Sequence, residues 1–193
     1  MFELFFQKLN EKITLTDGDK EIIKSLLLPK KLRRRQYLLQ EGDVCKYTAF
    51  VEKGALRSYT VDEKGSEHIV QFAVEGWYIS DLYSFITAEP ATNNIDAIED
   101  SELLLISKPA QDELMRKVPQ YERFIYLQMQ GAYVALQRRI TAMISMTTEE
   151  KYRNLLNTYP DIVQRVPQHM IASYLGLTPE TLSRTRRQMS IKK

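Results

Sequence analysis

Four polar side chains near the C-terminal end of the sequence lie at the spacing of one helix face. Ser183, Arg184 and Arg187 follow Glu180 by three, four and seven residues. An arginine can donate to both acceptors on the edge of guanine, and a carboxylate can accept from the amino group of cytosine. This chemistry is typical of a helix that reads base edges in the major groove of DNA.

The residues around this face have the outline of a helix-turn-helix between residues 166 and 184. Gly176 tolerates the left-handed backbone that ends many helices, Thr178 is a good N-cap, and Pro179 fits a first helical turn. The second helix is therefore predicted to begin at Pro179. The shared core is predicted to contain Ile171, Ala172, Leu175 and Leu182.

Charge supports contact with nucleic acid at this end of the chain. Residues 164–193 contain six basic side chains and one acidic side chain, whereas the whole chain has a net charge of only +2. The alternative is that Glu180 and Arg184 form an ordinary surface ion pair along the helix. The predicted DNA-contacting residues are Thr178, Pro179, Glu180, Thr181, Ser183, Arg184 and Arg187.

Few other residues suggest chemistry. Cys45 is the single cysteine, so it is either a small buried residue or a redox-active thiol, and the first interpretation is favoured. His68 and His169 lie far apart without the spacing of metal ligands. We therefore expect no metal, no cofactor and no enzymatic activity.

The elements that position the C-terminal helix begin with two short helices before residue 28, the second of which is capped by Thr16 and Asp17. From Lys31 to Ile106, short runs rich in branched and aromatic residues alternate with turns at residues 42–43, 53–54, 63–65 and 75–76. This pattern predicts an antiparallel roll. The basic run at residues 30–35 either contacts nucleic acid or forms a solvated sheet edge, and the edge is favoured.

A long helix is predicted from about Tyr121 to Ile144, with Pro119 close to its start. Its apolar residues follow the 3, 4, 3, 4, 3 spacing of a coiled-coil seam, although a helix packed in its own domain gives a similar pattern. Further apolar residues lie off the seam, so we expect contact with both the roll and a second copy. The predicted dimer residues are Tyr126, Met129, Tyr133, Leu136, Ile140 and Met143.

The sequence resembles the CRP/FNR family of bacterial transcription factors over nearly its whole length. Residues 176–184, Gly-Leu-Thr-Pro-Glu-Thr-Leu-Ser-Arg, match the family's recognition-helix signature at the Glu-Thr and Arg positions. Residues 38–43 and 51–54 are similar to its strand and turn signatures. The resemblance implies that Glu180 and Arg184 read bases, and that Pro179 replaces a residue that also contacts DNA.

The sensor half departs from the members that bind cyclic nucleotides. There, a Gly-Glu pair holds the ribose, and an Arg-Ser pair with a following small residue holds the cyclic phosphate. An ungapped alignment places Ser80 and Asp81 on the first pair and Ala91, Thr92 and Asn93 on the second. Since Ala91 replaces the phosphate-binding arginine, cyclic AMP is not expected to bind.

A different small molecule is an alternative for this region, as is constitutive DNA binding without an effector. The molecule would be lined by aromatic residues, for which a core role is favoured: Trp77, Tyr78, Tyr83 and Phe85. The candidate effector pocket consists of Trp77, Ser80, Asp81, Ala91, Thr92 and Asn93.

Together these features predict an α+β chain with three segments: a jelly-roll-like antiparallel β-roll at residues 1–118, a dimerisation helix at 119–146 and a helix-turn-helix domain at 147–193. The predicted function is a cytoplasmic, homodimeric, sequence-specific transcription regulator that binds double-stranded DNA. RNA polymerase and an unidentified small molecule are the other partners considered, and no membrane contact is expected. The alternative is a small-molecule-binding module whose C-terminal helices contact protein.

Overall fold

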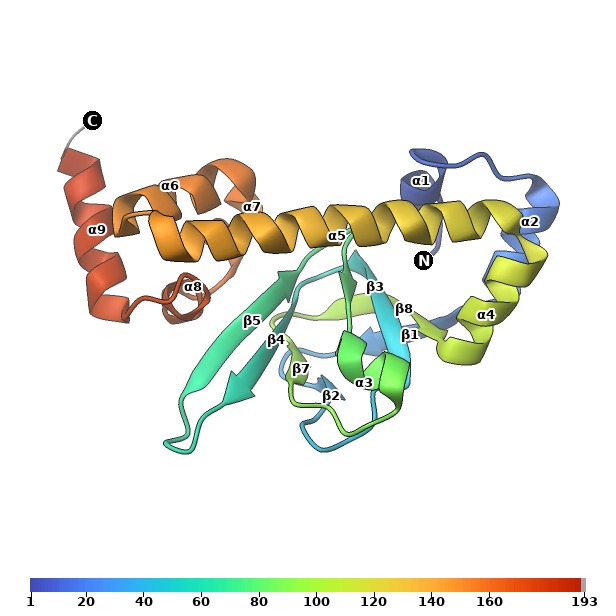
Figure 1. Cartoon of the computed structure of the whole chain (residues 1–193), viewed down its shortest axis with the longest axis horizontal. Coiled ribbons are helices and arrows are strands. Elements are labelled where there is room, and N and C mark those ends of the chain that lie inside the picture. Colours follow the sequence, from blue (N-terminus) through green and yellow to red (C-terminus); the bar gives the residue numbers. More distant parts are fainter. Residues whose placement is uncertain (192–193) are drawn as a thin grey trace. The chain divides into compact units, whose positions relative to one another are not determined.

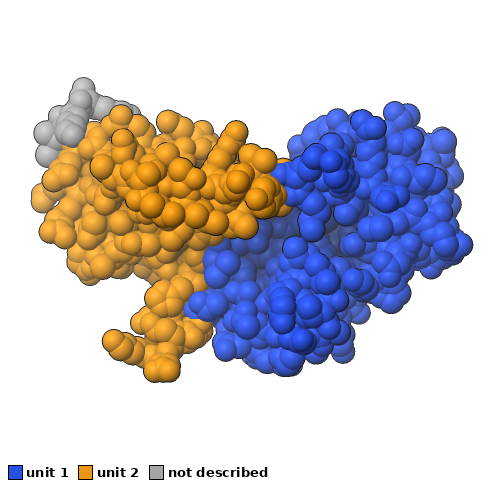
Figure 2. All heavy atoms as spheres, viewed as in Figure 1, with its two compact units in different colours: residues 1–60, 70–130 blue, residues 61–69, 131–193 orange. Residues whose placement is uncertain are grey.

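The computed structural model describes residues 1–191 and divides into two compact units (Figures 1 and 2). The first unit contains residues 1–60 and 70–130, and the second contains residues 61–69 and 131–193. Lys192 and Lys193, which contribute to the predicted basic charge, lie outside the described residues. Within the described part of the chain, no helix has the length and apolar character needed to cross a membrane.

Two four-stranded antiparallel sheets form the predicted roll. One has the order β1-β8-β3-β6 and the other β2-β7-β4-β5. Gly54 turns the chain between β3 and β4 with a φ of 101°, and a Cβ there would lie 2.3 Å from the Ser101 hydroxyl. The strands are β1 (Leu28–Leu32), β2 (Tyr37–Leu39), β3 (Tyr47–Lys53), β4 (Leu56–Val61), β5 (Glu67–Ala73), β6 (Tyr78–Ile79), β7 (Asn94–Ala97) and β8 (Ser101–Ser107).

The first strand begins at Leu28, three residues before the predicted start. Pro29 is tolerated there because β1 lies at the edge of its sheet. The basic run is exposed except for Leu32, and the Lys31 ammonium lies 2.8 Å from the Glu102 carboxylate. These contacts agree with the favoured interpretation of a solvated sheet edge.

Helices cover the outer face of the first sheet. Phe5 and Leu9 of α1 (Glu3–Asn10) and Ile23 of α2 (Asp17–Leu26) pack in one core with Phe50 of β3 and Leu104 of β8. Thr16 caps α2, as predicted. The same core includes residues of α4 (Lys108–Lys117) and the start of α5 (Pro119–Ser145). A separate apolar core fills the inside of the roll, and α3 (Leu82–Thr87) contributes Phe85 to it.

The second unit contains the rest of α5, the tip of the β4–β5 hairpin and four shorter helices. These are α6 (Thr148–Thr158), α7 (Pro160–Arg165), α8 (Gln168–Tyr174) and α9 (Pro179–Ile191). Thr147 caps α6 through a capping box with Glu150. Two features differ from the sequence-based segments: α7 is a separate helix, and the unit boundary falls within α5 at residues 130–131.

Candidate DNA interface and sensor cluster

The helix-turn-helix has the core that the sequence predicts. Ile171, Ala172, Leu175 and Leu182 are buried, and residues from α6 and α7 complete the core. Gly176 adopts a φ of 69°, and its N–H donates to the Ser173 carbonyl at 3.0 Å. This left-handed residue closes α8 and directs the chain toward α9.

The recognition helix begins at Pro179, as predicted. The Thr178 hydroxyl accepts from the Thr181 N–H at 3.2 Å and thereby caps the first turn of α9. A fixed N-terminus is required for base reading, because the first turns of such a helix enter the groove.

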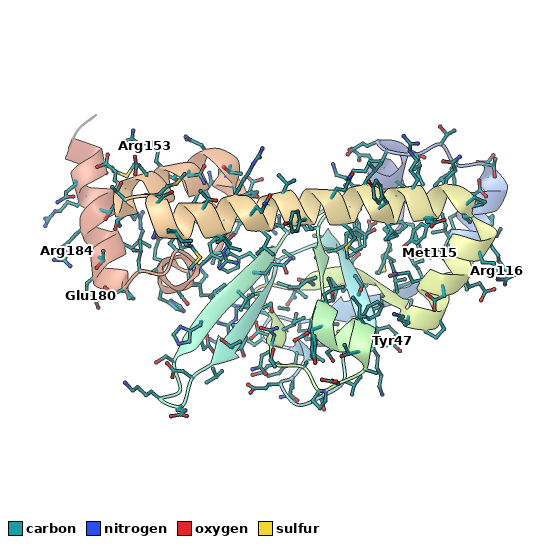
Figure 3. All side chains as sticks on the ribbon, viewed as in Figure 1. Tyr47, Met115, Arg116, Arg153, Glu180 and Arg184 are labelled. Carbon is teal, nitrogen blue, oxygen red and sulfur yellow. The ribbon has the colours of Figure 1, made fainter. Side chains whose placement is uncertain are left out.

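The predicted reading face is open to solvent. Glu180, Ser183, Arg184 and Arg187 are all exposed, and Figure 3 shows Glu180 and Arg184 on α9. The Arg184 guanidinium lies 3.5 Å from the Thr181 hydroxyl. No ion pair within 4.0 Å joins Glu180 to Arg184 among the described residues, so the ordinary surface-pair alternative is not formed here.

The Glu180 carboxylate is stabilised as an anion. Hydrogen bonding to its own backbone N–H, and then to the Thr178 hydroxyl, lowers the pKa of Glu180, and the Arg184 charge adds to the effect. Glu180 is therefore an exposed anionic acceptor at the start of α9.

The apolar seam of α5 is only partly covered by the described residues of its own chain. Tyr126, Met129, Tyr133, Leu136, Ile140 and Met143 are between 47% and 63% exposed. By contrast, Tyr121 and Phe124 at the start of the helix are fully buried in the first unit. The helix is thus fully buried only at its beginning, and six large side chains of the seam remain about half exposed to solvent.

In the sensor half, two of the expected pocket residues, Thr92 and Asn93, donate to the carboxylate of a third, Asp81. Asp81 Oδ2 accepts from the backbone N–H groups of Thr92 and Asn93 at 3.2 and 3.3 Å, and from the Asn93 side-chain amide at 2.8 Å. Asp81 Oδ1 accepts from the Ser84 N–H at 3.1 Å and caps α3. Asp81 is only 3% exposed, so these bonds form a buried, internally satisfied cluster.

The ionised state of Asp81 is favoured despite its burial. Burial by itself would raise the pKa of the carboxyl group, but the hydrogen bonds from Ser84, Asn93 and Thr92 outweigh it and lower the pKa. The cluster therefore already contains one negative charge.

The other expected pocket residues do not join this cluster in one site. Ala91 is 3% exposed and packs in the core of the roll, while Trp77 packs against that core from its edge. Of the remaining aromatic candidates, Phe85 is core, the Tyr78 hydroxyl is buried elsewhere, and Tyr83 is exposed. These aromatics do not converge on a common ligand site.

A cavity of about 320 Å³ lies in the same unit but is lined by different residues. Its lining contains none of the six expected pocket residues. Tyr47, one of the lining residues, is labelled in Figure 3. The lining residues are Leu38, Leu39, Asp43, Val44, Cys45, Lys46, Tyr47 and Ile95.

Cys45 agrees with its favoured interpretation as a buried structural residue. Its thiol donates to the Tyr47 carbonyl at 3.3 Å, and burial raises the pKa of the thiol. A reactive thiol would need the opposite shift. His68 and His169 are exposed, and within residues 1–191 no group of three His, Cys, Asp or Glu side chains could hold a metal ion.

Sequence reasoning missed a buried ion pair in the second sheet of the roll. Arg57 of β4 lies opposite Asp96 of β7, and its Nε and Nη2 donate to the two carboxylate oxygens at 2.8 and 3.0 Å. The Arg57 guanidinium also stacks 4.1 Å from the Tyr59 ring centre. The two residues are 39 positions apart, so only the strand register reveals the pair.

Comparison with known proteins connects both halves of the chain to one family. The model of the cyclic nucleotide-binding domain matches residues 29–118. Regulatory protein HlyX of Actinobacillus pleuropneumoniae is 29% identical over 89% of this chain and 75% of its own length. The fumarate and nitrate reduction regulatory protein of Vibrio cholerae is 28% identical over 89% of this chain and 72% of its own length.

Among solved structures, FixK2 from Bradyrhizobium japonicum has a similar fold, with a TM-score of 0.72 at 20% identity. The similarity covers 86% of this chain and 85% of FixK2. These similarities favour DNA binding over the alternative of protein contacts by the C-terminal helices. The roll, the long helix, the helix-turn-helix and these similarities together support assignment of the chain to the CRP/FNR family of DNA-binding transcription regulators.

Proposed function

We propose that the chain acts as a homodimer that reads a pseudo-palindromic DNA site with two copies of α9. The observation that carries this proposal is the exposed face of Glu180, Ser183, Arg184 and Arg187 on a capped helix with a buried core behind it. Arg184 is placed to donate to guanine, and Glu180 to accept from cytosine. Thr178, Thr181 and Pro179 lie at the start of the helix, where phosphates and flanking bases would be contacted.

The exposed seam of α5 supports the dimeric state. A parallel pair of α5 helices would bury the same six side chains from each copy and remove them from water. The two helix-turn-helix domains, related by a two-fold axis, would then face successive major grooves, which lie about 34 Å apart. As a regulator of chromosomal genes, the protein would work in the cytoplasm, and RNA polymerase is a further proposed partner.

The Asp81 cluster supports a sensor that does not respond to cyclic AMP. Thr92 and Asn93 align with the residues that would hold the cyclic phosphate, yet their N–H groups already donate to Asp81. A phosphate in this place would lie beside a carboxylate and would have no arginine at position 91 to neutralise it. A small molecule of another kind is left as a candidate effector.

Iterative selection from random-sequence DNA at about 100 mM salt tests the proposal, since specific binding persists at salt concentrations that weaken purely electrostatic contacts. The selection is run with and without cyclic AMP. We expect enrichment of one palindrome to the same extent in both conditions. Failure to enrich any sequence would contradict direct DNA reading by the free protein, and enrichment only with the nucleotide would contradict the sensor assignment.

A further inference from the structure

The outer edge of β5 is bound by side chains of the second unit. The Ser173 hydroxyl accepts from the Ile69 N–H at 2.9 Å and donates to the Glu67 carbonyl at 3.0 Å. One Nη of Arg139 lies 3.4 Å from the Ile69 carbonyl. Since β5 is the last strand of its sheet, three backbone groups that would otherwise lack a partner on that side are satisfied.

The same arginine also holds the helix that carries Ser173. The Arg139 guanidinium lies 4.2 Å from the centre of the Tyr174 ring, and Tyr174 follows Ser173 on α8. Arg139 in turn directly precedes Ile140 of the exposed α5 seam. A short series of contacts therefore runs from the seam, through Arg139, to the hairpin tip and to α8, and all of it lies in one compact unit.

The position of α8 determines that of α9. The Leu177 N–H donates to the Ala172 carbonyl at 2.9 Å, which closes the turn between the two helices. Leu182 of α9 is buried, as are Ile171 and Ala172 of α8, and the two helices contact each other. A change in how α8 sits on the β5 edge would therefore move the reading face as well.

We propose that Ser173 and Arg139 are positioning residues, which dock the helix-turn-helix on the β5 edge and so set the angle and separation of the two α9 helices on DNA. This inference rests on the proposed function as a dimeric DNA reader. Neither residue lies on the reading face, so each acts through α8 rather than through a base. We name the hydrogen bonds of Ser173 and Arg139 to Glu67 and Ile69, together with the contact of Arg139 with the Tyr174 ring, the hairpin dock.

A purely structural role predicts a different behaviour. If the hairpin dock only covers an edge strand, its loss lowers stability and leaves the preferred distance between half-sites unchanged. If the hairpin dock positions the helix-turn-helix domains, its loss relaxes the preference for the distance between half-sites. The preference for the bases within each half-site then stays unchanged. Half-site distance is therefore the measurement that separates the two roles.

The test uses the full-length chain and the palindrome from the selection, together with versions whose spacer is one base pair longer or shorter. One base pair rotates a half-site by about a tenth of a turn. We expect the wild type to prefer the selected spacer by about tenfold, and Ser173→Ala to retain only about a two- to threefold preference. Ser173→Thr, which keeps a hydroxyl, should restore most of the preference.

Ser145→Ala is the matched control, because the Ser145 hydroxyl donates to the Thr141 carbonyl within α5 and makes no dock contact. Amide hydrogen exchange at Ile69 should accelerate in Ser173→Ala and not in Ser145→Ala. A Ser173→Ala variant that discriminates between spacers as sharply as the wild type would overturn the inference alone. A wild type without any sequence preference would overturn the proposed function, and this inference with it.

Discussion

The reading face of α9 and the Asp81 cluster contain similar chemical groups in opposite circumstances. On α9, a carboxylate and two guanidinium groups are exposed, and the Glu180–Arg184 pair is not closed. Around Asp81, a carboxylate is buried and accepts four hydrogen bonds from residues of its own chain. Groups of the first kind are available to an external partner, whereas groups of the second kind are already committed to the fold.

The difference separates the two proposed roles, because α9 offers polar groups to an external partner and the Asp81 cluster does not. Base reading requires free donors and acceptors on a rigid support, and the buried core behind α9 supplies that support. Phosphate binding would require free amide donors, and Thr92 and Asn93 give theirs to Asp81. Mutations on α9 should therefore change binding, while mutations at Asp81 should change stability.

The largest effect is expected from breaking the proposed dimer, because a monomer would bring only one reading face to the DNA. Leu136→Glu combined with Ile140→Glu places charges in the exposed seam, where a second copy would bury them. The variant should sediment as a monomer, and its affinity for the palindrome should fall by about a thousandfold or more, toward non-specific binding. A variant that stays dimeric would show that the seam is not the interface.

Arg184→Ala tests the first region directly. Each bidentate contact to guanine contributes about 1–3 kcal/mol of discrimination, so preference for the selected site should fall about 10- to 100-fold per half-site. The melting temperature should stay unchanged, because the side chain is exposed. Arg116→Ala removes the same charge from α4 (Figure 3) and serves as the control, for which unaltered sequence preference is expected.

Asp81→Ala tests the second region, where the opposite pattern is expected. Loss of the carboxylate leaves buried N–H groups of Ser84 and Asn93 without an acceptor, which should cost about 2–4 kcal/mol of unfolding free energy. Denaturant unfolding measures this cost. Asp19→Ala, which removes a partly exposed carboxylate from the α2 capping box, should cost less. Equal losses in the two variants would argue against a special role for the Asp81 cluster.

The pH dependence of stability provides a finer test of the same cluster. The lowered pKa of Asp81 means that its stabilising contribution is complete above the unfolded-state pKa of about 3.9 and is lost as the pH falls through the folded-state value. The difference in unfolding free energy between wild type and Asp81→Asn should be constant near neutral pH and shrink in acid. A difference that grows in acid would contradict the ionised state.

The smallest effect is expected at the cap of the recognition helix. Thr178→Ala removes the acceptor for the Thr181 N–H and should lower stability by about 1 kcal/mol. Because the first turn of α9 would fray, specific DNA binding should weaken as well, by less than in Arg184→Ala. Thr178→Ser keeps the hydroxyl and should behave like the wild type in both measurements.

Local signals in the sequence were sufficient for many elements. Thr16 and Thr178 each cap a helix as predicted, and Pro179 begins α9, because capping depends on neighbours only a few residues away. The roll, the long helix and the helix-turn-helix core also follow from periodicity and turn residues. The exact start of β1 and the existence of α7 did not follow, since strand ends and short helices depend on contacts with distant segments.

The candidate DNA face was predictable from sequence because a helix places residues three and four apart on one side, whatever surrounds it. Tertiary structure alone decided which polar groups are used internally. The bonds of Asp81 to Thr92 and Asn93, the pairing of Arg57 with Asp96, and the dock of Ser173 on Glu67 and Ile69 join residues 11 to 106 positions apart. No local pattern encodes such partners, because they meet only when strand register and helix packing bring them together.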